Sequence, residues 1–284
     1  MAFLDVEQGK RVYYEHFRGD NTPVVLVHCW GGTTRLWNTV VSALLGAGHE
    51  VLTLDHRGCG ESDKDFTDAS IGAIASDVVT LVEKCGLVKP ILNGWSLGGA
   101  VVMEAASRLG DNVGGVVLTG AATPRFTPTQ DWPYGNDRQG SEDSLALMAQ
   151  DRAAAMKAIA DACFAKPVSA DLSQWAWSQF TQNGPRADQS LRELIDIDQR
   201  DLARQLDHPV LVIAGDQDAF IPFDGVEASI GLFKDARLFT MSGCGHAPHM
   251  EEPATYNAEL LSYLQKVGGR TSVSSTTPTF PSPI

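Results

Sequence analysis

Short apolar runs alternate with segments of helical periodicity along most of the chain. The apolar runs predict buried strands, because a strand whose two faces are both covered by helices needs no polar residues. A looser alternation over residues 10–17 predicts an edge strand. The predicted strands are 23–28, 50–55, 91–92, 114–120, 209–214 and 236–241, of which the first three are expected to be buried.

The segments between these runs repeat their apolar residues at the spacing of an amphipathic helix. In residues 71–85, for example, Ile71, Ile74, Val78 and Val82 fall on one helical face. The other predicted helices of this part are 37–45, 100–106, 224–233 and 253–267. Strands that alternate with helices imply β-α-β units, so the predicted fold class is α/β with a mostly parallel, doubly wound sheet.

One long stretch, 124–206, interrupts this rhythm because it contains no β-like run. It has helical spacing at 142–165, 170–181 and 186–204. We expect a helical lid, or cap, inserted between two strands of an α/β core that comprises 1–123 and 207–267. The final residues, 268–284, are rich in Gly, Ser, Thr and Pro and predict a disordered tail.

The composition limits the classes of partner. A net charge of −13 argues against nucleic acid or an anionic membrane as the partner, and no apolar stretch is long enough to span a bilayer. The five cysteines are scattered without a C-x-x-C spacing, which favours reduced thiols over a zinc site or a disulfide framework. Since the start also lacks the signal-peptide pattern, we expect a cytoplasmic protein without a metal or cofactor. The sequence does not indicate an oligomeric state.

The clearest chemical signal is a serine between two glycines. Ser96 follows a short apolar strand and precedes an apolar helix, with Gly94 and Gly98 two positions away on either side. This G-x-S-x-G pattern is typical of a sharp, strained strand-to-helix turn that holds a nucleophilic hydroxyl at the end of the strand. The backbone N–H of Leu97 would then lie at a helix N-terminus, where negative charge is favoured.

A serine hydroxyl needs a base, and the base needs an orienting carboxylate. Two later loops at the carboxyl end of the predicted sheet contain these residue types. The first contains Asp216 and Asp218, and the second contains His246 and His249. The chain order serine, aspartate, histidine is the one expected with a G-x-S-x-G turn. Asp216 is also suited to turn formation through its side chain, and His249 to a structural role near a helix start.

These segments together resemble the α/β-hydrolase superfamily, and within it the carboxylesterases that include the cofactor-free haloperoxidase, or perhydrolase, group. The matching segments are 26–32 (LVHCWGG), 55–62 (DHRGCGES), 94–99 (GWSLGG), 215–218 (GDQD) and 245–246 (GH). The resemblance covers about residues 10–266 and is weakest across the expected lid. It is specific for the superfamily and carries little information about the substrate.

Carried onto this sequence, the family pattern implies three catalytic side chains. They are the nucleophile Ser96, the general base and acid His246, and the orienting acid Asp218 at the fourth position of G-x-x-D. The resemblance also implies an oxyanion hole made by the backbone N–H groups of Trp30 and Leu97.

Residues beside these motifs have plainer interpretations. Cys29 stands where the family usually has glycine, and only His28 is near enough in sequence to activate its thiol. His28 is itself expected to bond local backbone groups, and Arg57 and Glu61 to form a solvated charge pair. His56 occupies a variable position of its motif and has no assigned role.

Candidate pocket residues lie beside the motifs and in the expected lid. Their aromatic side chains suit an apolar or aromatic ester, although each could instead pack the core or the lid helices. The candidates are Cys29, Trp95, Trp132, Trp175, Trp177 and Phe220.

These inferences predict a serine hydrolase that cleaves a small uncharged carboxylic ester or lactone through an acyl-enzyme on Ser96. The same residues would serve a C–C bond hydrolase, a thioesterase or a perhydrolase. A small-molecule receptor built on a hydrolase fold is the alternative from another class.

Overall fold

The computed structural model describes residues 2–271 and places eight strands in one sheet. The strands are β1 (Ala2–Glu7), β2 (Lys10–Phe17), β3 (Asn21–Val27), β4 (His49–Leu54), β5 (Ile91–Trp95), β6 (Gly115–Thr119), β7 (Val210–Gly215) and β8 (Ala236–Met241). Their order across the sheet is β1-β2-β4-β3-β5-β6-β7-β8. β1 and β2 pair antiparallel, as do β2 and β4, and all other neighbours are parallel. The predicted mostly parallel α/β sheet is therefore confirmed.

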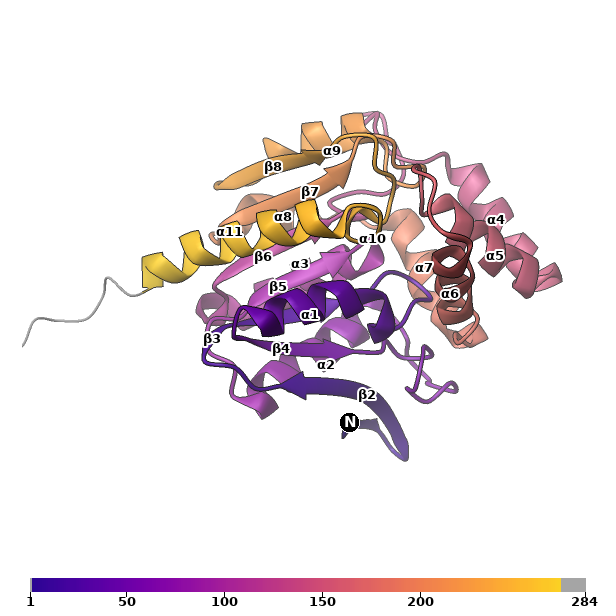
Figure 1. Cartoon of the computed structure of the whole chain (residues 1–284). Coiled ribbons are helices and arrows are strands. Elements are labelled where there is room, and N and C mark those ends of the chain that lie inside the picture. Colours follow the sequence, from indigo (N-terminus) through magenta and orange to yellow (C-terminus); the bar gives the residue numbers. More distant parts are fainter. Residues whose placement is uncertain (1, 272–284) are drawn as a thin grey trace, which may run out of the picture.

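Helices cover both faces of this sheet (Figure 1). Outside the segment between β6 and β7, the helices are η1 (Thr34–Trp37), α1 (Asn38–Gly46), α2 (Ile71–Cys85), α3 (Leu97–Leu109), η2 (Gly110–Asn112), α9 (Phe223–Ile230), α10 (Pro248–Glu251) and α11 (Pro253–Thr271). α1 and α11 pack together on one face, and α2 packs against α3 on the other. Both layers bury the apolar faces that the helical periodicity predicts.

The ends of α2 show how local sequence sets an element. Its N-cap is Ser70, whose side chain accepts a hydrogen bond from the N–H of Ala73. Its C-cap is Gly86, whose φ of 67° lies in the left-handed region that favours glycine. The helix consequently spans the residues that the sequence pattern predicts.

Five α-helices lie between β6 and β7 in the chain. They are α4 (Arg138–Gln150), α5 (Arg152–Ala162), α6 (Ala170–Phe180), α7 (Asp188–Asp196) and α8 (Arg200–Gln205), with the short η3 (Pro185–Ala187) between α6 and α7. α4 to α7 form a group beyond the carboxyl ends of the parallel strands, whereas α8 packs on α3 (Figure 1). We call residues 124–206 the helical insertion.

The two ends of the chain differ from the sequence expectation. The two edges of the sheet are β8 and β1; the sequence analysis missed β1 and expected residues 10–17 at the edge instead. β1 lacks the alternation of apolar and polar residues that predicts a strand, because Leu4 is its only buried side chain. At the other end, α11 continues to Thr271. The rest of the predicted tail, 272–284, lies outside the described residues.

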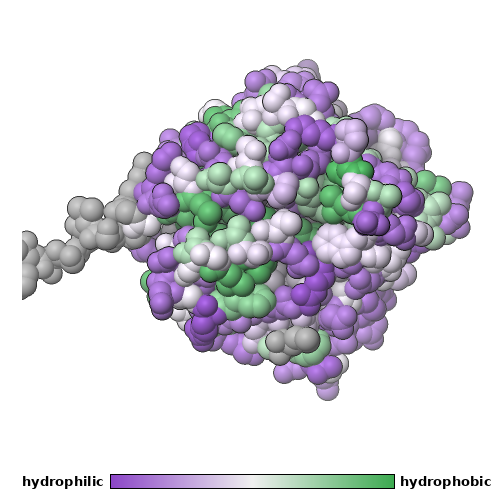
Figure 2. All heavy atoms as spheres, in the orientation of Figure 1, coloured by the Kyte–Doolittle hydropathy of each residue, from purple (hydrophilic) through white to green (hydrophobic). Residues whose placement is uncertain are grey.

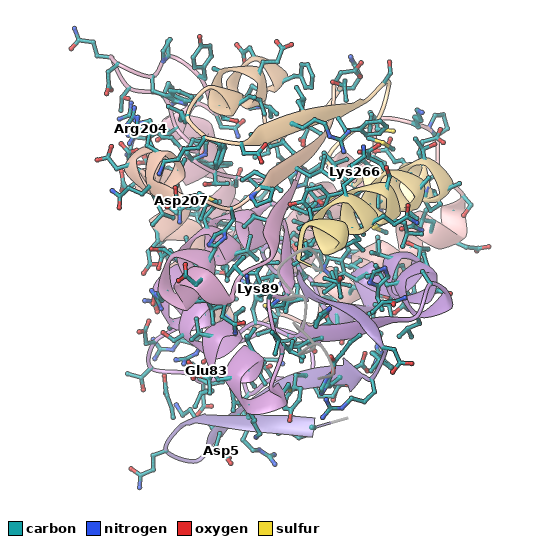
Figure 3. All side chains as sticks on the ribbon, turned by 90° about the vertical axis from the view of Figure 1, so that its left-hand side faces the viewer. Asp5, Glu83, Lys89, Arg204, Asp207 and Lys266 are labelled. Carbon is teal, nitrogen blue, oxygen red and sulfur yellow. The ribbon has the colours of Figure 1, made fainter. Side chains whose placement is uncertain are left out.

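The end of the sheet opposite the insertion is a charged surface. Figure 3 looks onto this end, where the labelled Lys89 and Asp207 precede β5 and β7. On the face seen in Figure 2, hydrophilic residues surround small apolar patches. No helix within residues 2–271 is long and apolar enough to cross a membrane.

Arg57 forms a buried ion pair, so its expected solvated pairing with Glu61 is wrong. Its guanidinium donates two hydrogen bonds of 2.7 Å to the carboxylate of Asp77 on α2 and one of 3.2 Å to Glu7 on β1. The side chains of Arg57 and Asp77 are only 8% and 3% exposed, whereas Glu61 is exposed. Burial raises the pKa of Asp77, and the Arg57 guanidinium opposes that rise. The pair therefore ties the turn after β4 to α2 and to the edge strand.

Replacing Arg57 by methionine should lower the free energy of unfolding by about 3–5 kcal/mol, because Asp77 would remain as an uncompensated buried charge. Urea unfolding followed by circular dichroism measures this change. Lys157→Met is the matched control, since it removes a half-exposed pair with Asp161 and should cost less than about 1 kcal/mol. Equal losses in the two variants would contradict the role given to the Arg57–Asp77 pair.

Candidate active site

Ser96 lies in a sharp turn between β5 and α3. Its φ of 57° and ψ of −121° are unusual for a residue with a side chain. Close approach explains the flanking glycines: a Cβ on Gly94 would lie 2.2 Å from the carbonyl oxygen of Gly98, and one on Gly98 would lie 2.3 Å from that of Val27. The strained serine backbone that the motif predicts is therefore present.

The same close packing brings two backbone segments together. A Cβ on Gly98 would also lie 2.6 Å from the carbonyl oxygen of His28, so the start of α3 abuts the loop that follows β3. Leu97 is the first residue of α3, and its N–H consequently has no acceptor within the helix. The backbone N–H of Trp30, in the adjoining loop, makes no hydrogen bond within residues 2–271. Two free donors thus lie on neighbouring segments.

His246 and Asp218 are joined by a buried hydrogen bond. The distance from His246 Nδ1 to Asp218 Oδ2 is 2.8 Å, and both side chains are at most 4% exposed. The other carboxylate oxygen, Oδ1, accepts hydrogen bonds from the N–H groups of Phe220 at 2.7 Å and Ile221 at 3.0 Å. These backbone donors fix the carboxylate, which in turn fixes the imidazole ring with Nε2 unengaged by Asp218.

Asp216, the rival acid, has a different role. It accepts a hydrogen bond of 2.7 Å from the N–H of Gly243 and one of 3.2 Å from the hydroxyl of Ser242. These bonds keep its carboxylate ionised by lowering its pKa, and they tie the loop after β7 to the loop after β8. Asp216 therefore positions the histidine loop, and it is Asp218 that bonds His246.

Three further contacts hold the histidine loop in place. The Trp95 indole N–H donates to the carbonyl of His246 at 2.7 Å. The N–H of Ala247 donates to the carbonyl of Cys163 in the insertion at 3.0 Å. Glu251 accepts a hydrogen bond from the N–H of Gly245 at 2.8 Å. The loop is thus anchored to the sheet, to the insertion and to α10.

His249 has the buried structural role expected of it. Its ring is fully buried, with ring centroids 4.6 Å from those of both Trp37 and Trp95. This burial lowers the pKa of His249 to about 3, with a smaller contribution from His246. The ring is consequently neutral at physiological pH and lies in the core.

His28 and His56 form a buried stacked pair beneath the loop that carries Trp30. Their ring centroids are 3.7 Å apart. His28 Nδ1 lies 2.6 Å from the carbonyl oxygen of Cys29, and Nε2 accepts a hydrogen bond from the N–H of His56 at 3.0 Å. Burial lowers the pKa of His28 to about 4. The pair is therefore neutral, and His28 bonds local backbone as expected.

Ser96 and His246 both line a cavity of about 360 Å³ between the sheet and the insertion. Cys29, Trp30 and Phe220 also line it. The insertion contributes mainly apolar side chains, including Phe126, Met148, Ile159, Phe180, Leu191 and Leu194. A polar rim around the start of α4 consists of Asn136, Asp137, Ser141 and Ser144. None of the described lysines and arginines lines the cavity.

Four tryptophans expected to line the pocket do not line this cavity. Trp95 is fully buried in the core because it ends a central strand whose two faces are covered by helices. Trp175 and Trp177 are half-buried and pack against the hydrophobic core. Trp132 lines a separate cavity of about 20 Å³. These predictions are therefore wrong for the main cavity, whereas those for Cys29 and Phe220 agree with it.

The sequence analysis missed the polar rim and most of the apolar wall. Those residues belong to the insertion. Helical periodicity there identifies the buried face of each helix, but it does not show whether that face contacts another helix or a cavity. Asp137 shows the difficulty, because it reads as a helix N-cap and does accept a hydrogen bond from the N–H of Gly140. In the described part of the chain, no group of three or more His, Cys, Asp or Glu side chains is arranged to hold a metal ion.

Comparisons with known proteins agree with this geometry. The sequence model of the alpha/beta hydrolase fold family matches residues 22–253. The chain is 27% identical over 276 residues to a non-heme haloperoxidase of Rhodococcus erythropolis, which covers 93% of this chain and 100% of that protein.

Two solved structures are also similar to the chain. An esterase from Exiguobacterium antarcticum superimposes with a TM-score of 0.88 at 27% identity, covering 93% of this chain and 98% of the esterase. A bromoperoxidase from Bacillus anthracis superimposes with the same TM-score and identity, covering 93% and 99%. The chain belongs to the α/β-hydrolase family, and within it resembles the haloperoxidases and esterases.

Proposed function

We propose that this hydrolase cleaves a small uncharged carboxylic ester or lactone with Ser96 as the nucleophile. The observation that carries the proposal is the 2.8 Å bond between His246 and Asp218 at a cavity whose wall also includes the elbow serine. A nucleophile, a base and an orienter of that base are the minimum set for acyl transfer through a serine. The five free cysteines also fit the expected cytoplasmic location.

The proposed reaction uses the hydroxyl of Ser96 and the Nε2 atom of His246. Ser96 attacks the carbonyl carbon while His246 takes its proton through Nε2, because Nδ1 is engaged by Asp218. The structure contains no hydrogen bond between Ser96 and His246, and such bonds often form only in the substrate complex. His246 then returns the proton to the leaving alcohol. Water attacks the resulting acyl-enzyme in the same way and releases the acid.

The N–H groups of Trp30 and Leu97 would bind the oxyanion of each tetrahedral intermediate. Both donors belong to the backbone, so they need no reorganisation as negative charge develops on the carbonyl oxygen. In comparable sites, losing one such donor slows turnover by about 10²–10³-fold. The position of the loop that carries Trp30 therefore contributes to turnover together with the side chains of the triad.

The cavity wall supports an uncharged substrate. Most of its surface is apolar, and a carboxylate or phosphate placed there would find neither lysine nor arginine. Asp137 at the rim adds a negative charge at the exposed start of α4. We therefore favour a neutral ester or lactone over a coenzyme A thioester. Cleavage of a C–C bond and perhydrolysis would use the same residues.

The first test is labelling by a fluorophosphonate, followed by intact-mass spectrometry and peptide mapping. We expect one adduct, on Ser96, and hydrolysis of 4-nitrophenyl esters that falls to background in Ser96→Ala. Thermal unfolding of Ser96→Ala checks that the variant is folded. A folded wild-type protein that takes no label would rule out an activated serine and favour the receptor alternative.

Asp218→Asn should lower kcat by about 10³–10⁴-fold, because an asparagine in this place favours the wrong imidazole tautomer. Steady-state ester hydrolysis measures the effect. Asp216→Asn is the matched control from the same loop, and we expect it to retain most of the activity, with any loss arising from a loosened histidine loop. If Asp216→Asn were as inactive as Asp218→Asn, the assignment of the acid would be wrong.

A negative charge on the acyl group should be disfavoured. We expect kcat/KM for 4-nitrophenyl butyrate to exceed that for the hemisuccinate, which ends in a carboxylate, by at least about tenfold because the wall would leave that charge unpaired. Asp137→Asn should bring the two values of kcat/KM closer together, because it removes a negative charge from the cavity rim. Asp143→Asn, on the same helix but away from the cavity, should leave it unchanged. Equal rates for the two esters would contradict an uncharged substrate.

A further inference from the structure

The helical insertion contacts three positions of the loop that carries Trp30. We propose that its segment 179–187 sets the geometry of the oxyanion hole, with Asn183 and Arg152 as positioning residues. This inference rests on the proposed function, because it concerns the oxyanion donor of that reaction. It gives the insertion a role in the chemical step in addition to its role as a wall of the cavity.

Hydrogen bonds join the two segments at three points. The indole N–H of Trp30 donates to the carbonyl of Ala187 at 2.9 Å. The side-chain amide of Asn183 donates to the carbonyl of Gly31 at 3.2 Å. The hydroxyl of Thr33 donates to Gln179 Oε1 at 2.9 Å. All three bonds are buried, so water does not compete for them.

The loop has little support from its own backbone. Its internal turn has one hydrogen bond, from the N–H of Gly32 to the carbonyl of Cys29, and this bond is long at 3.3 Å. The backbone of Gly31 has a φ of 69°, and a Cβ there would lie 2.7 Å from Asn183 Nδ2. Gly31 is therefore fitted closely against Asn183, and displacement of either would move the adjoining N–H of Trp30.

Arg152, at the start of α5, fixes Asn183 in turn. Its guanidinium donates to Asn183 Oδ1 from both Nε and Nη2, with the Nε distance at 3.1 Å. It also forms a two-pronged ion pair with Asp188 at 3.0 Å and 2.9 Å and donates to the carbonyl of Gly184 at 3.2 Å. A planar guanidinium bound on several sides has little freedom. The amide of Asn183 is thereby oriented with its Nδ2 toward Gly31.

This arrangement predicts a defect of a particular kind. A misplaced oxyanion donor weakens binding of the transition state and leaves binding of the ester ground state nearly intact. The loss should therefore appear in kcat with KM almost unchanged. It should be the same for short and long acyl chains, because the loop holds the carbonyl oxygen common to all esters.

Asn183→Asp is the sharpest variant. It keeps the size of the side chain and its acceptors for Arg152, but an ionised carboxylate cannot donate to Gly31. We expect kcat per active site to fall by about 10–100-fold, while KM changes by less than about threefold. A trifluoromethyl ketone mimics the oxyanion, so its inhibition constant should rise by the same factor as kcat falls. Arg152→Met should reproduce the pattern more weakly, by about 3–10-fold, because the donor remains but is no longer fixed.

Titration with the fluorophosphonate counts the active sites, so a fraction of unfolded protein does not enter kcat. The control is Arg200→Met, which breaks ion pairs with Asp131 and Asp198 in the same insertion without contacting the loop, and it should leave kcat within about twofold of wild type. A wild-type protein labelled on Ser96, together with unchanged kcat in Asn183→Asp, would overturn this inference alone. So would a loss that depends on acyl chain length. An unlabelled wild type would overturn the proposed function, and this inference with it.

Discussion

The close packing of α3 against β3 and β5 is the constraint on which the candidate site depends. Gly94 and Gly98 each approach another backbone so closely that no Cβ fits. The turn between them forces Ser96 to a positive φ, which costs about 1–3 kcal/mol. Three backbone hydrogen bonds offset part of this strain: the N–H of Ser96 donates to the carbonyl of Thr119, and the carbonyl of Ser96 accepts from the N–H groups of Gly99 and Ala122. The backbone of Ser96 is therefore held by hydrogen bonds to the end of β6, to the segment after it and to the first turn of α3.

The other parts of the site are held by the insertion as well as by the core. The histidine loop bonds Cys163, and the loop of Trp30 bonds Asn183 and Ala187. Trp30 combines two functions, since its backbone lies in the proposed oxyanion hole while its side chain lines the cavity and reaches the insertion. Binding and chemistry are consequently coupled through one segment. On this proposal, a change in the insertion that alters the pocket also alters the position of the proposed catalytic groups.

The sequence was most informative where function depends on contiguous residues. The elbow around Ser96 and the fold class follow from local spacing, because a backbone turn is specified by its own glycines. Arg57 was misread because its partners, Glu7 and Asp77, are distant in the chain. Trp95 was misread because sequence proximity to Ser96 does not give the direction of a side chain. The family resemblance favours Asp218 over Asp216, and the hydrogen bonds of the two carboxylates agree with that choice.

Burial also explains why His249 stays neutral although it lies only three positions from His246, which takes up a proton in the proposed reaction. Protonation of His246 during the proposed reaction creates a positive charge that Asp218 is placed to stabilise. A second charged ring nearby would oppose that protonation. His249 avoids this conflict because its full burial against Trp37 and Trp95 keeps it neutral. The tryptophans that fill the core beneath the site therefore have an electrostatic consequence as well as a packing role: they leave Asp218 as the only charged partner that His246 contacts in the described structure.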